Sequence, residues 1–117
     1  MKKLTKQEFL EKVFDYENES EFKFKGDKPI VLKFGADWCA PCKSVEPILE
    51  QISKEYEGKV DFYSVDIVAE EQLAKDFQIK SIQAIYFIPN NDEPPQLAIG
   101  ALPRDQILKA IYNFLHV

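Results

Sequence analysis

The stretch PIVLKFGADWCAPCK, residues 29–43, contains both cysteines of a chain of 117 residues. It begins with apolar and β-branched residues, which are typical of a buried strand, and Gly35 ends that run. Pro41 then opens a helix, where its missing amide hydrogen costs nothing in the first turn. The stretch therefore predicts a buried strand that leads into a helix, with Cys39 and Cys42 near the start of that helix.

The remaining sequence predicts further helices and strands around this unit. A capping box at Thr5 and Glu8 starts the first helix, and Gly58 stops the helix that begins at Pro41. The other expected elements are a short edge strand in 22–24, strands at 60–66, 84–89 and 96–100, a short helix in 70–77, and a last helix from Pro103. That last helix should bury one stripe of residues, namely Ile107, Leu108, Ile111, Phe114 and Leu115. This order predicts one α/β domain over residues 1–117, with a mixed central β-sheet and helices on both faces.

The composition describes a folded protein and excludes several classes of partner. Hydrophobic residues make up 45% and charged residues 30% of the chain, and the net charge is −5. A protein that binds nucleic acid usually carries a dense positive field, which is absent here. No apolar run is long enough to cross a bilayer, and charged residues interrupt the N-terminal segment where a signal peptide would be apolar. We therefore expect a cytoplasmic protein that binds neither nucleic acid nor membrane.

Three explanations account for two cysteines placed this close together. A permanent disulfide would close a loop of about four residues and would stabilise the fold by only ~2 kcal/mol. A zinc site needs four ligands, and besides Cys39 and Cys42 the chain has no other cysteine and only one histidine, His116. One chain alone therefore does not complete a metal site, although two chains sharing four thiols would. The third explanation is a redox-active pair.

The redox explanation has a direct physical basis. Free amides and the dipole at a helix N-terminus favour negative charge, which lowers the pKa of a thiol placed there. Cys39 should be the more exposed sulfur, and Cys42 should lie one turn further in. Trp38 would either form an apolar shoulder beside the exposed sulfur or anchor the loop.

The segment ADWCAPCK resembles the active-site motif of the thioredoxin family, Trp-Cys-Gly-Pro-Cys-Lys, with Ala40 in place of glycine. The similarity extends from about Leu4 to Leu115, and it includes Pro47 within the helix after the motif. The resemblance implies a thioredoxin fold and a thiol–disulfide oxidoreductase that needs no cofactor. Cys39 would attack a disulfide of a client protein, and Cys42 would resolve the mixed disulfide. A thioredoxin reductase would be the electron donor, and the protein would be a monomer.

The resemblance also implies a client-binding surface formed by Trp38, Pro41, Ile82 and Gln83. The chain departs from the family here, because Gln83 replaces a cis-proline. A cis bond before a residue other than proline costs about 2.5–4 kcal/mol, so the bond between residues 82 and 83 is expected to be trans. The Gln83 amide would hydrogen-bond a client or shield the thiols.

Two further departures lie near the cysteines. Lys33 replaces the family's buried aspartate, and Ser64 replaces a nearby lysine. Lys33 would either modulate the redox couple or extend to the edge of the sheet without sensing Cys42. These changes leave an alternative function open: a thioredoxin-fold binding module with weak reductase activity, which captures one partner or holds a metal or iron–sulfur cluster between two chains.

Overall fold

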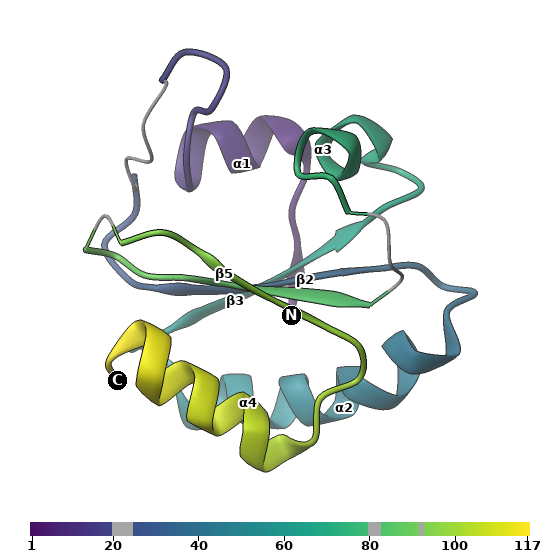
Figure 1. Ribbon diagram of the computed structural model, residues 1–117, viewed down its shortest axis with the longest axis vertical. Coiled ribbons are helices and arrows are strands. Elements are labelled where there is room, and N and C mark those ends of the chain that lie inside the picture. Colours follow the sequence, from purple (N-terminus) through teal and green to yellow (C-terminus); the bar gives the residue numbers. More distant parts are fainter. Residues whose placement is uncertain (20–24, 80–82, 92) are drawn as a thin grey trace.

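The computed structural model describes residues 1–19, 25–79, 83–91 and 93–117, and it has three layers (Figure 1). A β-sheet forms the middle layer, helices α1 and α3 cover one face, and helices α2 and α4 cover the other. The elements are, in order, β1 (Lys2–Lys3), α1 (Lys6–Lys12), β2 (Ile30–Gly35), α2 (Ala40–Glu55), β3 (Asp61–Asp66), α3 (Glu71–Asp76), β4 (Ala84–Ile88), β5 (Gln96–Ile99), α4 (Arg104–Ala110) and a π-helical turn, η1 (Ile111–Leu115).

The sheet is mixed, as predicted, and β2 is its central strand. The strand order is β1-β3-β2-β4-β5. Strand β2 pairs in parallel with β3 and antiparallel with β4, and β4 pairs antiparallel with β5. The parallel pairing requires a long crossover between β2 and β3, and helix α2 provides it. The end of β2 therefore leads straight into the helix that begins with the cysteine motif.

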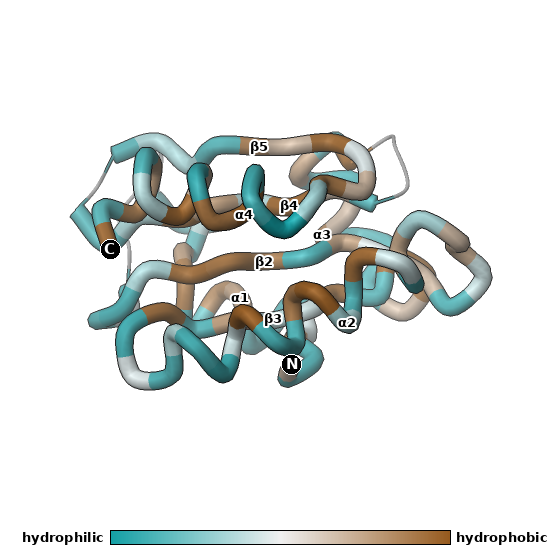
Figure 2. The backbone as a smooth tube through the Cα atoms, turned by 90° about the horizontal axis from the view of Figure 1, so that it is seen from below, coloured by the Kyte–Doolittle hydropathy of each residue, from teal (hydrophilic) through white to brown (hydrophobic). Residues whose placement is uncertain are grey.

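The apolar residues form two cores, one on each face of the sheet. On the α2 and α4 side, Val31, Ile85 and Phe87 of the sheet pack with the buried stripe of the two helices. On the α1 and α3 side, Leu32 and Phe34 pack with residues that include Phe9 and Leu73. Figure 2 shows the hydrophobic run of β2 behind the amphipathic turns of α2. Because side chains alternate along a strand, Lys33 and Gly35 share with Val31 the face that α2 covers.

Several local predictions are confirmed at the residue level. The Thr5 hydroxyl accepts a hydrogen bond from the Glu8 amide, and the Glu8 side chain accepts one from the Thr5 amide, at 3.1 Å each. Gly58 follows helix α2 with a φ of +83°, a conformation that glycine adopts without strain.

Three details differ from the sequence predictions or fall outside the described residues. Strand β1 was not expected, because two lysines carry no strand signal; it forms by pairing with Tyr63 and Ser64 of β3. The last helix ends in a π-helical turn. The prediction that Phe114 is buried is wrong, because its side chain in this turn is 38% exposed. The edge strand predicted in 22–24 lies outside the described residues.

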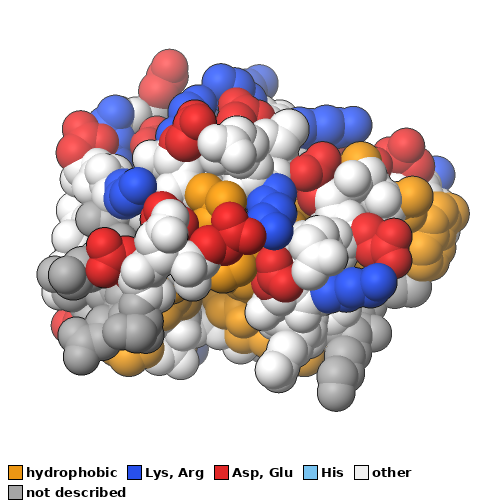
Figure 3. Space-filling model, turned by 90° about the horizontal axis from the view of Figure 1, so that it is seen from above, with side chains coloured by type: hydrophobic (Ala, Val, Ile, Leu, Met, Phe, Trp, Pro, Cys, Tyr) orange, Lys and Arg blue, Asp and Glu red, His pale blue; other side chains and the backbone are white. Residues whose placement is uncertain are grey.

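The surface carries both signs of charge. On the face with α1 and α3, basic and acidic side chains are interspersed, with hydrophobic groups between them (Figure 3). In the described parts of the chain, no helix combines the length and the apolar character that a membrane span requires.

Candidate active site

The end of β2 delivers the two cysteines to the start of α2. After Gly35 the chain turns, and the Cys39 amide donates a hydrogen bond to the Ala36 carbonyl at 3.1 Å. Cys39 then occupies the N-cap position of α2, with an extended backbone at φ −90° and ψ 109°. Cys42 lies one turn further in, as predicted.

Cys39 and Cys42 form a disulfide, with their Cα atoms 5.3 Å apart. Both residues are buried, with 2% exposure each. The prediction that Cys39 is the more exposed is therefore wrong for this oxidised form, in which each sulfur covers part of the other. The different chemistry of the two sulfurs must come from their positions on the helix.

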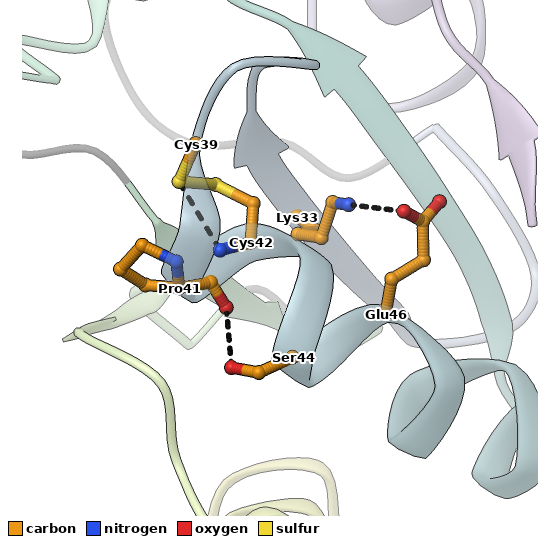
Figure 4. Close-up of a disulfide and its surroundings, with 6 residues drawn as sticks. All are labelled: Lys33, Cys39, Pro41, Cys42, Ser44 and Glu46. Atoms are coloured by element: carbon orange, nitrogen blue, oxygen red, sulfur yellow. Dashed lines mark hydrogen bonds and ion pairs between the residues drawn. A yellow bond between two sulfur atoms is a disulfide. The ribbon is translucent and has the colours of Figure 1, made fainter.

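The sulfur of Cys39 serves as the cap of helix α2. It accepts a hydrogen bond from the backbone amide of Cys42 at 3.1 Å (Figure 4). The first amides of a helix have no partner within the helix, and together with the helix dipole they favour negative charge. A donated amide hydrogen bond and the helix N-terminus therefore both stabilise a thiolate at Cys39.

Pro41 and Trp38 flank the disulfide in different ways. Pro41 lies in the first turn, where no amide hydrogen is needed, and its carbonyl accepts a hydrogen bond from the Ser44 hydroxyl at 3.0 Å. Trp38 is 63% exposed, which argues against a role as an anchor packed under the loop. Its indole is an apolar surface available to a binding partner.

Lys33 lies beside the disulfide and not at the edge of the sheet. It is only 6% exposed. A Cβ atom placed on Gly35 would lie 2.9 Å from the Cys42 sulfur and 3.4 Å from Cε of Lys33, so the lysine stem and that sulfur flank the same point. The ammonium extends to Glu46 of α2, at 3.7 Å from its carboxylate (Figure 4). Ser64 is opposite Lys33 in the register of β2 and β3 and is also buried.

A small polar pocket lies next to Lys33 and Glu46. Its volume is about 80 Å³. Lys33, Gly35, Glu46 and Ser64 contribute to its lining. The pocket therefore brings Lys33 of β2, Glu46 of α2 and Ser64 of β3 to one cavity.

Gln83 immediately precedes β4. Its backbone has a φ of +68°, which is uncommon for any residue except glycine. Its side chain is fully buried, and neither amide atom has a hydrogen-bond partner among the residues that the structure describes. An unpaired buried amide is costly, so the position is strained and poorly satisfied. Ile82, and with it the bond between residues 82 and 83 that was expected to be trans, lies outside the described residues.

Sequence reasoning missed two residues of this site, Gly35 and Glu46. Glu46 follows Cys42 by four positions on α2, so the two share a helix face. Lys33 and Gly35 share a strand face with each other. Combining these two periodicities would have placed Glu46, Lys33 and Cys42 together. Within the described ranges, no group of three or more metal-binding side chains is present.

Comparison with known proteins points to one family. A family model described as Thioredoxin matches residues 1–113. The chain is 41% identical over 111 residues to a thioredoxin of Borreliella burgdorferi, covering 95% of this chain and 94% of that protein. It is 30% identical over 95 residues to an M-type chloroplastic thioredoxin of Spinacia oleracea, covering 81% of this chain and 52% of that longer protein.

A solved structure supports the fold independently. The crystal structure of chloroplastic thioredoxin z matches with a TM-score of 0.76 at 24% identity, covering 95% of this chain and 90% of that one. The predicted α/β fold with its mixed, helix-flanked sheet is confirmed.

Proposed function

Because the chain belongs to the thioredoxin family and is a thiol–disulfide oxidoreductase, we propose that it reduces disulfides of client proteins, with Cys39 as the attacking and Cys42 as the resolving thiol. One observation carries the assignment: the Cys42 amide donates a hydrogen bond to the sulfur of Cys39. Cys39 is therefore the sulfur at which negative charge is best stabilised, and the thiolate is the attacking species in disulfide exchange.

The proposed reaction has two exchange steps. The Cys39 thiolate attacks one sulfur of the client disulfide, which forms a mixed disulfide and releases the other client sulfur as a thiolate that takes up a proton. Cys42 then loses its proton and attacks Cys39, which forms the Cys39–Cys42 disulfide and releases the second client thiolate. Two electrons pass from the protein dithiol to the client. A thioredoxin reductase is the proposed donor that restores the dithiol.

We assign client binding to Trp38, Pro41, Ile82 and Gln83. The exposure of Trp38 supports this assignment, because exposed aromatic residues are favoured at binding surfaces. The Gln83 amide is unpaired but fully buried, so a client backbone would supply the hydrogen bonds that it lacks only after residue 83 moves to expose it. Lys33 is assigned a modulating role: as an ammonium beside Cys42 it favours thiolate and thereby a less reducing couple.

The proposed chemistry also bears on the cellular compartment in which the protein acts. A dithiol reductase is maintained in its reduced form in a reducing compartment, which supports a cytoplasmic location. Residues 1–117 are proposed to act as one domain and as a monomer, with disulfide-containing proteins as clients. The mass of the pure protein in solution tests the monomer.

Trapping of mixed disulfides tests the roles of the cysteines. Cys42→Ser should accumulate covalent complexes with disulfide-containing client proteins, because the mixed disulfide between Cys39 and the client cannot be resolved. Cys39→Ser should accumulate none, and both variants should fail to reduce insulin disulfides in a turbidity assay. Complexes that accumulate with Cys39→Ser instead would reverse the assignment.

The strained position of Gln83 favours a second candidate function, a binding module with weak reductase activity that holds one partner, or a metal or iron–sulfur cluster between two chains. Metal content, colour and mass of the pure protein test it directly. A weak insulin reductase whose activity rises on Gln83→Pro would support this module, whereas high activity of the parent protein would reject it.

A further inference from the structure

Lys33 places a positive charge beside the resolving cysteine. Lys33 lies on the central strand β2. A Cβ atom built on Gly35 would lie 3.4 Å from Cε of Lys33 and 2.9 Å from the Cys42 sulfur, so both side chains border the space above Gly35. When the disulfide is reduced, Cys42 becomes a buried thiol. A nearby ammonium lowers the free energy of a Cys42 thiolate, and the effect is larger in a buried site than in water.

Glu46 is the carboxylate that holds this ammonium. Among the described residues, it is the only acidic partner within 4.0 Å of Nζ of Lys33, at 3.7 Å. Glu46 lies four positions after Cys42, on the same face of α2, and its side chain is 51% exposed. Figure 4 shows the ammonium directed toward Glu46, with the two sulfurs on the opposite side of the lysine stem.

We propose that Glu46 is a positioning residue for the exchange reaction: it holds the Lys33 ammonium turned away from the sulfurs and so limits the stabilisation of a Cys42 thiolate. This inference rests on the proposed role of Cys42 as the resolving thiol. A thiolate that is too stable favours the reduced protein and makes the couple more oxidising. Glu46 therefore keeps the couple reducing despite the lysine on β2.

Glu46 acts on Cys42 in two ways that an experiment separates. Its carboxylate repels a thiolate directly, and it also fixes the position of Lys33. The other charged residues lining the same pocket are Lys3, Asp37, Lys43 and Asp66, and they stay unchanged in every variant. Only the part that acts through Lys33 disappears when the lysine is absent. A double-mutant cycle measures that part.

The experiment compares the parent, Glu46→Gln, Lys33→Met and the double variant, each equilibrated with reduced and oxidised glutathione. Glu46→Gln should shift the equilibrium constant toward the dithiol by about three- to tenfold. In the Lys33→Met background, less than half of that effect, on a logarithmic scale, should remain. Alkylation of Cys42 in a Cys39→Ser background gives a second readout: Glu46→Gln should lower the pH at which half of Cys42 reacts.

Glu55→Gln is the matched control, because it removes the same charge from the same helix. Glu55 pairs with Arg104 at 2.6 Å, and it lies thirteen positions after Cys42 along the helix, a distance of about 20 Å. Its glutathione equilibrium should change by less than about twofold. If Glu46→Gln has the same effect with and without Lys33, or no effect, the inference is overturned. Insulin reduction by the same proteins is scored separately, so retained activity with no shift would reject Glu46 alone and leave the proposed function standing.

Discussion

Gly35 and Cys42 are so close that the strand leaves no room for a side chain at residue 35. A Cβ atom there would lie 2.9 Å from the Cys42 sulfur and 3.3 Å from its Cβ. Gly35 has no positive φ, so its role is the close approach of strand and helix and not an unusual backbone conformation.

Gly35→Ala is therefore expected to destabilise the oxidised protein by about 1–3 kcal/mol, as overpacking in a buried site does. The loss should be smaller in a Cys39→Ala/Cys42→Ala background, where the Cys42 sulfur is absent. Urea unfolding of the four proteins measures both effects. Equal losses in the two backgrounds would show that the contact with the sulfur is not the cause.

Lys33→Asp should make the redox couple more reducing, because a carboxylate beside Cys42 disfavours the thiolate that the ammonium favours. A redox titration beside the parent protein measures the change. An unchanged or less reducing couple in the variant would reject the modulating role of Lys33. The burial of Lys33 against α2 is the reason to expect an effect that surface lysines do not have.

Gln83→Met should stabilise the protein by about 1–2 kcal/mol, since it replaces an unpaired buried amide with an apolar side chain of similar size. If the amide binds clients, the same variant should reduce insulin about fivefold more slowly, which corresponds to one lost hydrogen bond. Unfolding curves and initial rates test the two parts separately. A destabilised variant would mean that the amide is satisfied in the native protein.

Tyr16 and Asp76 link the stability of the protein to pH. The Tyr16 hydroxyl donates a hydrogen bond to the Asp76 carboxylate at 2.6 Å. That bond is the main reason that the pKa of Asp76 is lowered from 3.8, with Gln72 and Lys6 contributing. A lowered folded-state pKa adds stability above the unfolded value, and this stability is lost as the pH falls through the folded value.

Tyr16→Phe should therefore lower the free energy of unfolding at neutral pH, and the deficit should shrink below pH 3.8 as Asp76 is protonated. Urea unfolding at neutral pH and at about pH 2 measures it. Tyr112→Phe is the control, because Tyr112 is exposed. A deficit that is the same at both pH values would contradict the link to Asp76.

The elements with strong local signals could be predicted from the sequence. Thr5 and Glu8 specify a helix start through two side chains, and the apolar run before Gly35 specifies a buried strand. Strand β1 had no such signal, because Lys2 and Lys3 become a strand only by pairing with β3, which is a tertiary effect. The π-helical turn at Ile111–Leu115 likewise had no signal in the sequence.

The candidate site was predictable where residues adjacent in sequence make it, and less so where distant segments meet. The motif placed Cys39 at the start of a helix, and the structure confirms that position. The partner of Lys33 lies on another element, so the sequence suggested a lysine near Cys42 but not the carboxylate that holds it. The unusual backbone of Gln83 had no local signal, because glutamine does not normally favour positive φ.

The sulfur that is proposed to carry out the chemistry also terminates helix α2, since Cys39 is its N-cap. Whatever becomes bonded to that sulfur, whether Cys42, a client or an alkylating reagent, alters the end of the helix that follows. The capping hydrogen bond is present in the disulfide form, and a thiolate is a stronger acceptor than a disulfide sulfur. The strength of this helix cap would therefore change during each turnover, and the melting temperature of the protein would depend on the species bonded to Cys39.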